Sequence, residues 1–313
     1  MNILVTGGAG FIGSHLNDYL LKGGHKIVCI DDLSLGVRDN VAHNLNNENF
    51  EFVEMDILDK EKLNAIFEKG NFECVFHMAA NSDIQEGTRN IEQDLDKTFM
   101  TTFRILEAMK KNEVKDLVFA SSSAIYGDIK EKISEDIGPL KPVSLYGAAK
   151  LASEGYITAF GENFGIRSWI FRFPNVIGAR ATHGVVFDFV NKLKADPTKL
   201  VILGDGEQEK PYTYVTDIVE GILFGWENSK EQVNIFNLGV DSLSTVTRIA
   251  EIVVEEMGLE NVKFEYTGGK SGWVGDVPFY QYDLSKIHDL GWQASLFSDE
   301  AVRKSAQVIF GNK

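Results

Sequence analysis

A glycine-rich turn near the amino terminus constrains the fold more than any other feature of this chain. Gly7, Gly10 and Gly13 are spaced Gly-x-x-Gly-x-x-Gly, directly after the apolar run 3–5 and at the start of a helical pattern over residues 11–21. Glycines here permit a tight turn, let a pyrophosphate approach the backbone and let helix pack on strand. The free N–H groups at the start of the helix attract phosphate. The pattern predicts a dinucleotide site, and a turn that serves packing alone is the alternative.

Short apolar runs alternate with helical patterns through the first 172 residues. Strands are predicted at 3–5, 26–30, 50–53, 74–77, 117–120 and 168–171, and helices at 11–21, 61–67, 91–111 and 144–163. Strands that are apolar throughout indicate a parallel sheet covered on both faces, which right-handed crossovers wind doubly. The predicted fold class is α/β, with a Rossmann-type doubly wound parallel sheet.

The alternation loosens after residue 172, where glycine, aspartate and proline interrupt shorter elements. Helices are predicted at 217–227, 245–257 and 299–310. We predict two domains, an NAD-binding Rossmann domain over residues 1–172 and a smaller mixed α/β carboxyl-terminal substrate lobe over residues 173–313. Strands of this lobe can cross back to the main sheet. We expect the lobe at the carboxyl edge of the sheet, where α/β proteins bind ligands.

Charge and composition exclude several kinds of partner. The net charge of −15 argues against nucleic acid and against an anionic membrane surface. No apolar run approaches the roughly 20 residues of a membrane helix. Cys29 and Cys74 lie in apolar runs, which favours buried thiols over a disulfide or a metal site, and no metal is predicted. A first strand that begins at Asn2 leaves no room for a signal peptide, so we expect a cytoplasmic protein.

An acidic residue ends the second predicted strand. Asp31 lies 18 residues after Gly13, where an acid binds the adenosine ribose and disfavours a 2′-phosphate. No lysine or arginine follows until Arg38, so the pattern favours NAD over NADP. A capping role for Asp31 in the following turn is the alternative.

Two further strand ends suggest contacts with the dinucleotide. Asp56 and Ile57 follow the third strand and are candidates to meet the adenine, although an aspartate here often only shapes a turn. Met78, Ala79 and Ala80 follow the fourth strand, and their small side chains let a ligand lie close. His77, just before them, is expected to be a hydrogen-bonded, partly buried histidine rather than a catalyst or a metal ligand.

Tyr146 and Lys150 lie four residues apart in a helical pattern, so they share one helix face. A nearby ammonium favours the phenolate and lowers the tyrosine pKa from about 10. Such a phenolate can take a proton from a sugar hydroxyl while a nicotinamide takes the hydride. A surface tyrosine and lysine on an ordinary amphipathic helix are the alternative.

Together these motifs resemble the extended short-chain dehydrogenase/reductase family, in its NAD-dependent nucleotide-sugar epimerase/dehydratase branch. The likeness runs through essentially the whole chain and is closest to the UDP-glucose/UDP-galactose 4-epimerase subgroup. The segments that carry it are residues 6–15, 31–34, 77–80, 121–127, 146–150, 172–175 and 214–217.

The resemblance implies roles for individual residues. Tyr146 becomes the general base, Lys150 its electrostatic and ribose-binding partner, and Ser122 the hydroxyl that hydrogen-bonds the reacting oxygen; Ser123 is the less favoured serine. The implied cofactor-binding residues are Gly7, Gly10, Phe11, Ile12, Gly13, Asp31, Asp32, Ser34, Asp56, Ile57, Met78, Ala79, Ala80, Thr98, Tyr146, Lys150 and Phe173.

The resemblance also implies a substrate-binding set, which consists of Ser122, Ser123, Asn175, Val201, Leu203, Lys210, Trp273 and Tyr280. Asn175 and Lys210 are expected near a diphosphate, Tyr280 near the sugar, and the 200–203 run near the base or packed as an edge strand. Three positions depart from the family pattern. Thr98 replaces an asparagine, Lys210 replaces an arginine and loses its bidentate fork, and Trp273 replaces a second arginine. Trp273 is expected to stack on a base or to cover the core.

The serine segment indicates the reaction type. Dehydratases of the family carry Asp-Glu after the catalytic threonine and decarboxylases carry a glutamate, whereas this chain has Ser123 and Ala124. The resemblance therefore implies an NAD-dependent nucleotide-sugar 4-epimerase that oxidises C4 transiently, with a UDP-hexose as partner. It also implies a homodimer through the helices at 91–111 and 144–163. Another dehydratase, decarboxylase or dehydrogenase of the family, or a non-catalytic NAD-binding regulator, is the alternative.

Overall fold

The structure is a computed structural model that describes residues 1–273 and 275–311. The chain divides into two compact units. The first consists of Met1–Ile125, Ser144–Arg172 and Leu223–Phe236, and the second of Tyr126–Val143, Phe173–Ile222 and the chain from Asn237 onward. The predicted division into two functional domains at residue 172 stays a prediction.

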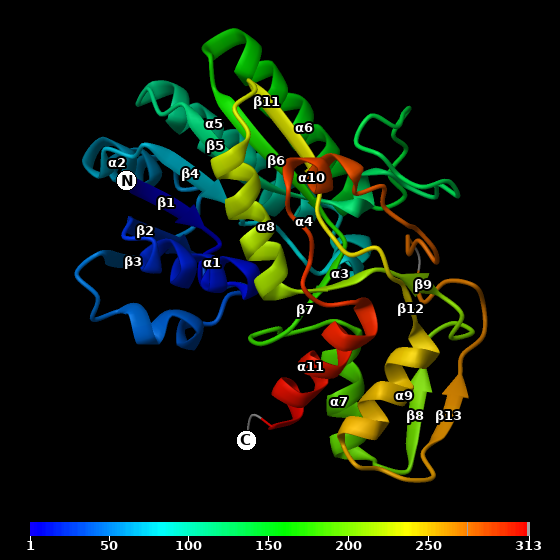
Figure 1. Ribbon diagram of the computed structural model, residues 1–313. Helices are drawn as coiled ribbons and strands as arrows, with labels where there is room; N and C mark the ends of the chain where they lie inside the picture. The colour runs from blue at the N-terminus through cyan, green and yellow to red at the C-terminus, as the bar shows by residue number, and fades with distance from the viewer. Residues whose placement is uncertain (274, 312–313) are drawn as a thin grey trace. The chain divides into compact units, whose positions relative to one another are not determined.

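A seven-stranded sheet, in the order β11-β6-β5-β4-β1-β2-β3, forms the centre of the first unit (Figure 1). The strands are β1 (Asn2–Thr6), β2 (Lys26–Asp31), β3 (Phe50–Glu54), β4 (Cys74–His77), β5 (Asp116–Ser122), β6 (Arg167–Phe173) and β11 (Val233–Asn237). β1 pairs in parallel with β2 and β4, β2 with β3, and β4 with β5. Thr6 is level with Ile30 and His77, so the carboxyl ends of these strands meet at one edge. The predicted Rossmann-type sheet is confirmed.

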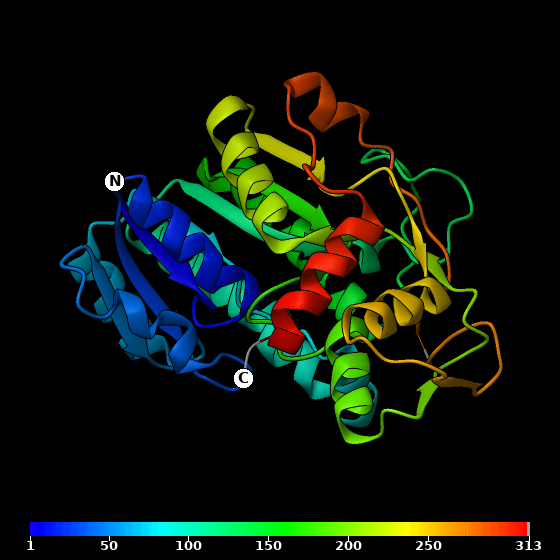
Figure 2. The ribbon, with the colours of Figure 1, turned by 60° about the horizontal axis from the view of Figure 1, so that its bottom comes forward.

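Helices lie on both faces of this sheet because the strand order reverses between β1 and β4. On one face, α2 (Lys60–Gly70), α5 (Thr101–Lys111) and α6 (Leu145–Phe164) pack side by side. Leu63, Ile105 and Ile157 of these helices share one buried core with Leu4 and Leu117 of the strands. α1 (Phe11–Lys22) packs along β1 and β2, as Figure 2 shows.

The helix predicted over 91–111 is a compound element. It consists of α4 (Glu92–Asp94), a π-helical stretch η2 (Leu95–Met100) and α5. The sequence pattern also missed α3 (Ile84–Arg89), the 3₁₀ segments η1 (Arg38–Asn44) and η3 (Ser123–Ile125), and β11 at the sheet edge.

The second unit is a mixed α/β structure. Its paired strands are β7 (Asn175–Ile177) with β10 (Tyr212–Tyr214), β8 (Lys199–Ile202) with β13 (Lys263–Tyr266), and β9 (Glu209–Lys210) with β12 (Ser244–Thr245). The first two pairs are parallel and the third is antiparallel. α7 (Val185–Ala195), α9 (Val246–Glu256) and α11 (Ser298–Gly311) pack together, and α10 spans Ser285–Leu290. α8 (Val215–Asn228) passes from the second unit into the first.

Cys29 and Cys74 are free and buried, as predicted. Among the residues that the structure describes, no histidine, cysteine and carboxylate side chains cluster in a way that would hold a metal ion. None of the described helices is both long enough and apolar enough to span a membrane.

Candidate active site

The glycine turn between β1 and α1 has no room for side chains. Gly7 has φ +64°, in the left-handed region, and a Cβ there would lie 2.7 Å from the Cα of Ala79. A Cβ on Gly13 would lie 2.3 Å from the carbonyl oxygen of Gly7. Gly10 caps α1 without any side-chain hydrogen bond, and Phe11 and Ile12 begin the first turn half-buried. The bare backbone at a helix amino terminus therefore fits the pyrophosphate of NAD.

Asp31 ties the end of β2 to this turn. Its buried carboxylate accepts hydrogen bonds from the backbone N–H of Ala9 and of Leu33, both at 2.9 Å. Burial raises the pKa of Asp31, and these hydrogen bonds oppose the rise. The bond from Leu33 is the turn-capping role that the sequence pattern allowed, and the contact with the ribose stays a prediction.

Asp32 and Asp56 lie at the ends of neighbouring strands and share one cation. The Nζ of Lys97 lies 2.7 Å from Oδ2 of each carboxylate. Ser34 donates to the Oδ1 of Asp32 from its hydroxyl and its backbone N–H, at 2.6 and 3.0 Å. Lys97 is not among the site residues predicted from the sequence, because no motif around it indicates a contact with β2 or β3. Ile57, beside Asp56, is buried.

The segment after β4 is built on His77, which is fully buried and hydrogen-bonded at both ring nitrogens. Nδ1 contacts Oγ1 of Thr6 at 2.6 Å and Nε2 contacts Oγ1 of Thr102 at 3.1 Å. Burial lowers the pKa of His77 to about 3, with a smaller contribution from the charge of Lys150. The expected hydrogen-bonded histidine is confirmed, although its burial is complete rather than partial. Met78, Ala79 and Ala80 follow it half-buried, and Thr98 accepts from the backbone N–H of Asn81 at 3.1 Å.

The structure brings Ser122, Tyr146 and Lys150 together in the first unit. Ser144 caps α6 by accepting from the N–H of Gly147 at 3.1 Å, which sets Tyr146 in the first turn. Tyr146 is hydrogen-bonded to Ser122 at the end of β5. The Nζ of Lys150 is buried, donates to the carbonyl of Ala120 at 2.5 Å and lies 5.8 Å from the centroid of the Tyr146 ring. Ser123 is half-buried in η3.

The prediction that Lys150 lowers the pKa of Tyr146 is wrong for this arrangement. Burial raises the pKa of Tyr146 to about 12, and the charge of Asp94 adds to the rise while the bond with Ser122 opposes it. Burial also lowers the pKa of Lys150 to about 7, against the opposing charge of Glu154. Desolvation acts on both groups because Lys150 is buried and Tyr146 is half-buried, rather than exposed on a helix surface.

Asp94 is a further buried carboxylate that the sequence pattern missed. Its Oδ1 accepts from the side-chain amide of Asn81 at 2.9 Å, whereas its Oδ2 is buried with no hydrogen-bond partner. Burial raises the pKa of Asp94. A Cβ on Gly87 would lie 2.0 Å from this Oδ2, so α3 closes directly over the carboxylate.

The remaining predicted substrate-binding residues lie in the second unit and form two groups. Asn175 donates from Nδ2 to the hydroxyl of Tyr280 at 3.5 Å. The Nζ of Lys210 lies 2.5 Å from Oδ1 of Asp276 and 5.4 Å from the centroid of the Trp273 ring, and both ion-pair partners are nearly buried. Val201 and Leu203 are exposed, at 37 and 42%, on and just after β8. Phe173 is buried, and its carbonyl accepts from Tyr282 at 3.0 Å. The roles of these residues stay predictions.

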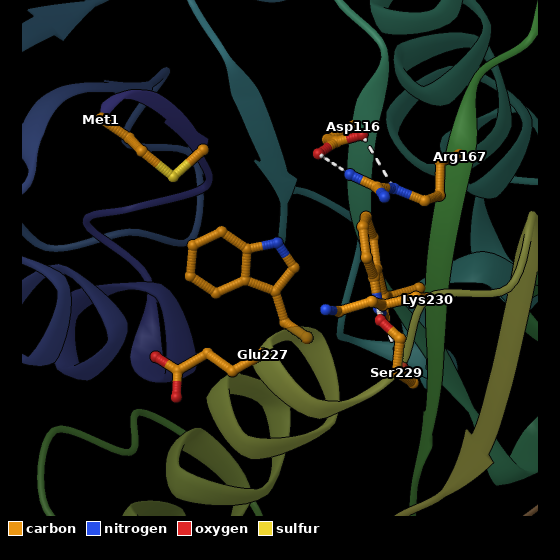
Figure 3. Close-up of a pocket in the computed structure, with 8 residues that line it drawn as sticks. Met1, Asp116, Arg167, Glu227, Ser229 and Lys230 are labelled. Atoms are coloured by element: carbon orange, nitrogen blue, oxygen red, sulfur yellow. Dashed lines mark hydrogen bonds and ion pairs between the residues drawn. The ribbon is translucent and has the colours of Figure 1, made fainter.

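A small pocket lies at the opposite, amino-terminal ends of β1, β5 and β6 (Figure 3). Figure 3 shows Arg167 paired with Asp116, and Nε to Oδ1 and Nη2 to Oδ2 measure 3.1 and 2.6 Å. Trp169 donates to the hydroxyl of Ser229 at 3.0 Å. The pocket therefore lies at the opposite ends of the strands from the candidate active site, and the Arg167–Asp116 and Trp169–Ser229 groups that line it are paired with each other.

Comparison with known proteins extends these observations. Residues 3–239 match the sequence model of the NAD dependent epimerase/dehydratase family. A putative UDP-glucose 4-epimerase of Methanocaldococcus jannaschii is 32% identical over 99% of this chain and 99% of its own. The crystal structure of a UDP-galactose 4-epimerase has a TM-score of 0.87 at 36% identity, covering 99% of this chain and 98% of its own. The UDP-glucose 4-epimerase of Thermotoga maritima, solved with UDP-glucose, has a TM-score of 0.89 at 32% identity over 98% of each chain.

The chain belongs to the NAD-dependent epimerase/dehydratase family. The matches extend along nearly its whole length, and the glycine turn and the helix that carries Tyr146 and Lys150 agree with them. The predicted family, its NAD cofactor and its enzymatic character are confirmed at this level.

Proposed function

We propose that the protein is a UDP-hexose 4-epimerase of the UDP-glucose/UDP-galactose type. The relatives from Methanocaldococcus jannaschii and Thermotoga maritima, which are named for UDP-glucose, cover nearly the whole chain and support this substrate class. The observation that carries the proposal is the grouping of Ser122, Tyr146 and Lys150 at the carboxyl end of β5.

The proposed mechanism uses these residues to move one proton. NAD bound at the glycine turn would supply the hydride acceptor for C4 of the sugar. Tyr146 takes the proton of the C4 hydroxyl and later gives it back, and Ser122 hydrogen-bonds the same oxygen. Between the two hydride transfers the 4-keto sugar rotates and presents its opposite face. Return of the hydride to that face inverts the configuration at C4.

The segment after β5 argues against a second proton transfer. Family dehydratases and decarboxylases carry acidic residues there, whereas Ser123 and Ala124 occupy η3 in this chain. Neither side chain can act as an acid or base near neutral pH. This favours return of the hydride at C4 over loss of water or carbon dioxide.

We assign the nucleotide end of the substrate to the second unit. Lys210 is proposed to meet the diphosphate together with Asn175. Trp273 is proposed to stack on the base, because this residue is 37% exposed and its ring lies beside the Lys210 ammonium. Tyr280 is proposed to contact the sugar, and Val201 and Leu203 to line the base. A firmly held nucleotide lets the hexose rotate without leaving.

We also propose a homodimer through α5 and α6. Tyr156 on α6 is 45% exposed and contacts Phe99 and Phe103 at ring-centroid distances of 5.1 and 6.0 Å. Leu95 and Ile91, next to this cluster in sequence, are 52 and 71% exposed. Apolar side chains exposed along neighbouring helices are typical of an interface. Light scattering of the wild type and of Tyr156→Asp tests it, because a charge there should yield a monomer.

Product analysis tests the proposed reaction. Purified protein is incubated separately with UDP-glucose, UDP-N-acetylglucosamine, UDP-glucuronate and GDP-mannose, and the products are resolved by NMR. We expect UDP-galactose from UDP-glucose, of unchanged mass and without added NAD. A product lighter by water or carbon dioxide would identify a dehydratase or decarboxylase instead. Binding of NAD without any product would support the non-catalytic regulator.

A further inference from the structure

One lysine joins the two strand ends at which we expect the adenosine half of NAD. Lys97 projects from η2, and its Nζ lies 2.7 Å from Oδ2 of Asp32, past β2, and 2.7 Å from Oδ2 of Asp56, past β3. The three side chains are only partly buried, with exposed fractions between 25 and 42%, so the cluster borders solvent. A ligand lying along the strand ends would reach it directly.

In each of the two carboxylates, one oxygen accepts from a backbone N–H and the other accepts from Lys97. Oδ1 of Asp32 accepts from the N–H of Ser34, and Oδ1 of Asp56 accepts from the N–H of Leu58 at 2.9 Å. Each Oδ1 therefore shapes its own turn, and each Oδ2 is held by Lys97. The ammonium fixes the orientation of both carboxylates at once and links the turn after β2 to the turn after β3.

Charge gives Lys97 a second effect. Two carboxylates within reach of one nitrogen would repel each other without a cation between them. Burial opposes ionisation of Asp32, but the hydrogen bond from Lys97 and those from Ser34 outweigh it and lower the pKa of Asp32. With Lys97 present, Asp32 remains an ionised acceptor, and the ammonium holds both carboxylates in fixed positions. Because two carboxylates already neutralise this ammonium, Lys97 does not provide a free cation for a 2′-phosphate.

We propose that Lys97 is a positioning residue for the adenosine half of NAD, and that by fixing Asp56 as a hydrogen-bond acceptor it selects a base that carries an exocyclic amino group. The inference rests on the use of NAD by this family and on the placement of the adenine at Asp56. It is independent of which sugar the enzyme converts.

Release of bound dinucleotide tests this without any turnover. Wild type, Lys97→Met and Lys97→Arg are loaded with NAD or with nicotinamide hypoxanthine dinucleotide, in which a carbonyl replaces the adenine amino group. Release is then followed by rapid gel filtration. Lys97→Met should release NAD about tenfold faster, the loss of roughly one charge-assisted hydrogen bond. Lys97→Arg should stay near wild type, since a guanidinium can bridge two carboxylates.

The selectivity between the two dinucleotides separates positioning from mere stability. Wild type should release the hypoxanthine dinucleotide faster than NAD. In Lys97→Met the ratio of these two release rates should be closer to one. Lys60→Met is the matched control, because Lys60 makes a 2.7 Å pair with Glu107 at an exposed site. It should leave both rates unchanged.

Four results would overturn all or part of the inference. Release of NAD from Lys97→Met at the wild-type rate would do so, as would faster release of both dinucleotides with an unchanged ratio. Asp56→Asn tests the position of the adenine independently. The amide N–H of the asparagine can donate to the hypoxanthine carbonyl, so this variant should retain the hypoxanthine dinucleotide better relative to NAD than the wild type does. An unchanged ratio in Asp56→Asn would remove the adenine from Asp56 and the inference with it. If the ratio of release rates shifts in Asp56→Asn but not in Lys97→Met, the adenine lies at Asp56 and only the role of Lys97 is overturned.

Discussion

The guanidinium of Arg172 donates two hydrogen bonds to the carboxylate of Glu154, from Nε to Oε1 at 3.1 Å and from Nη2 to Oε2 at 2.7 Å. Both side chains are almost completely buried, at 5 and 6%. Ser121 donates to the same Oε1 at 2.5 Å. Glu154 lies one turn after Lys150 on α6, so this network connects α6 to the ends of β5 and β6.

Glu154→Gln should lower the free energy of unfolding by about 3 kcal/mol or more, because it leaves the Arg172 charge buried without its counter-ion. Urea unfolding of the variant and the wild type measures the change. Glu54→Gln is the matched control, since Glu54 pairs with Arg38 at 3.3 Å with both side chains more than half exposed. An exposed pair of this kind contributes at most about 1 kcal/mol. Equal losses in the two variants would contradict the importance of burial.

Lys150→Met should abolish turnover and yet stabilise the fold near neutral pH. The folded-state pKa of Lys150 is lowered to about 7 by burial, so between pH 7 and about 10 the unfolded chain binds more protons than the folded one. This side chain therefore costs stability as the pH falls through that window, by up to a few kcal/mol. The advantage of the variant in free energy of unfolding should be largest at pH 7 and should shrink toward pH 10. Denaturant unfolding at several pH values checks this, and a pH-independent difference would contradict it.

Tyr146→Phe should lower turnover by about 10²-fold or more while it leaves the bound NAD in place, because only the proton-transferring hydroxyl is lost. Turnover is measured with UDP-glucose, and bound NAD is measured after extraction from the purified variant. Tyr156→Phe on the same helix is the control and should keep wild-type turnover. Undiminished turnover in Tyr146→Phe would remove this residue from the mechanism.

Local patterns predicted the parts of the site that depend on neighbours in sequence. The glycine turn follows a strand and begins a helix, and Tyr146 and Lys150 lie one helical turn apart, so their proximity needs no knowledge of the fold. The alternation of apolar runs likewise predicted six strands of the sheet. β11 escaped because it follows a long stretch of the second unit before it joins the sheet edge.

Contacts across the fold could not be predicted in the same way. Lys97 is 65 residues from Asp32 and 41 from Asp56, and it reaches both because β2 and β3 are neighbouring strands. The direction of the Tyr146 pKa shift was missed for a related reason. Spacing shows the ammonium on the same helix face, whereas desolvation depends on what the whole fold places around the phenol.

Asp94→Asn should lower the pKa of Tyr146, because the negative charge of Asp94 raises it in addition to the larger effect of burial. If phenolate is the active form, the acid limb of the pH–rate profile should then move to lower pH. Ultraviolet titration of tyrosinate, compared with Tyr146→Phe in the same background, assigns the shift to Tyr146. Asp96→Asn is the control, since Asp96 is exposed and its charge is screened by water. A profile that is unchanged in Asp94→Asn would contradict the electrostatic coupling.

Gly13→Ala and Gly155→Ala should have opposite effects, although both glycines lie in helices that carry the site. A Cβ at Gly13 would lie 2.3 Å from the carbonyl oxygen of Gly7, so α1 would have to move away from the glycine turn. We expect lower stability and loss of bound NAD, since the pyrophosphate needs this close approach. A Cβ at Gly155 meets no atom within 4 Å, and alanine there should stabilise α6 by about 0.5–1 kcal/mol through helix propensity. Thermal unfolding and the NAD content of the purified variants measure both effects. Retention of NAD by Gly13→Ala at wild-type stability would show that the turn tolerates a side chain and that the cofactor does not depend on its close packing.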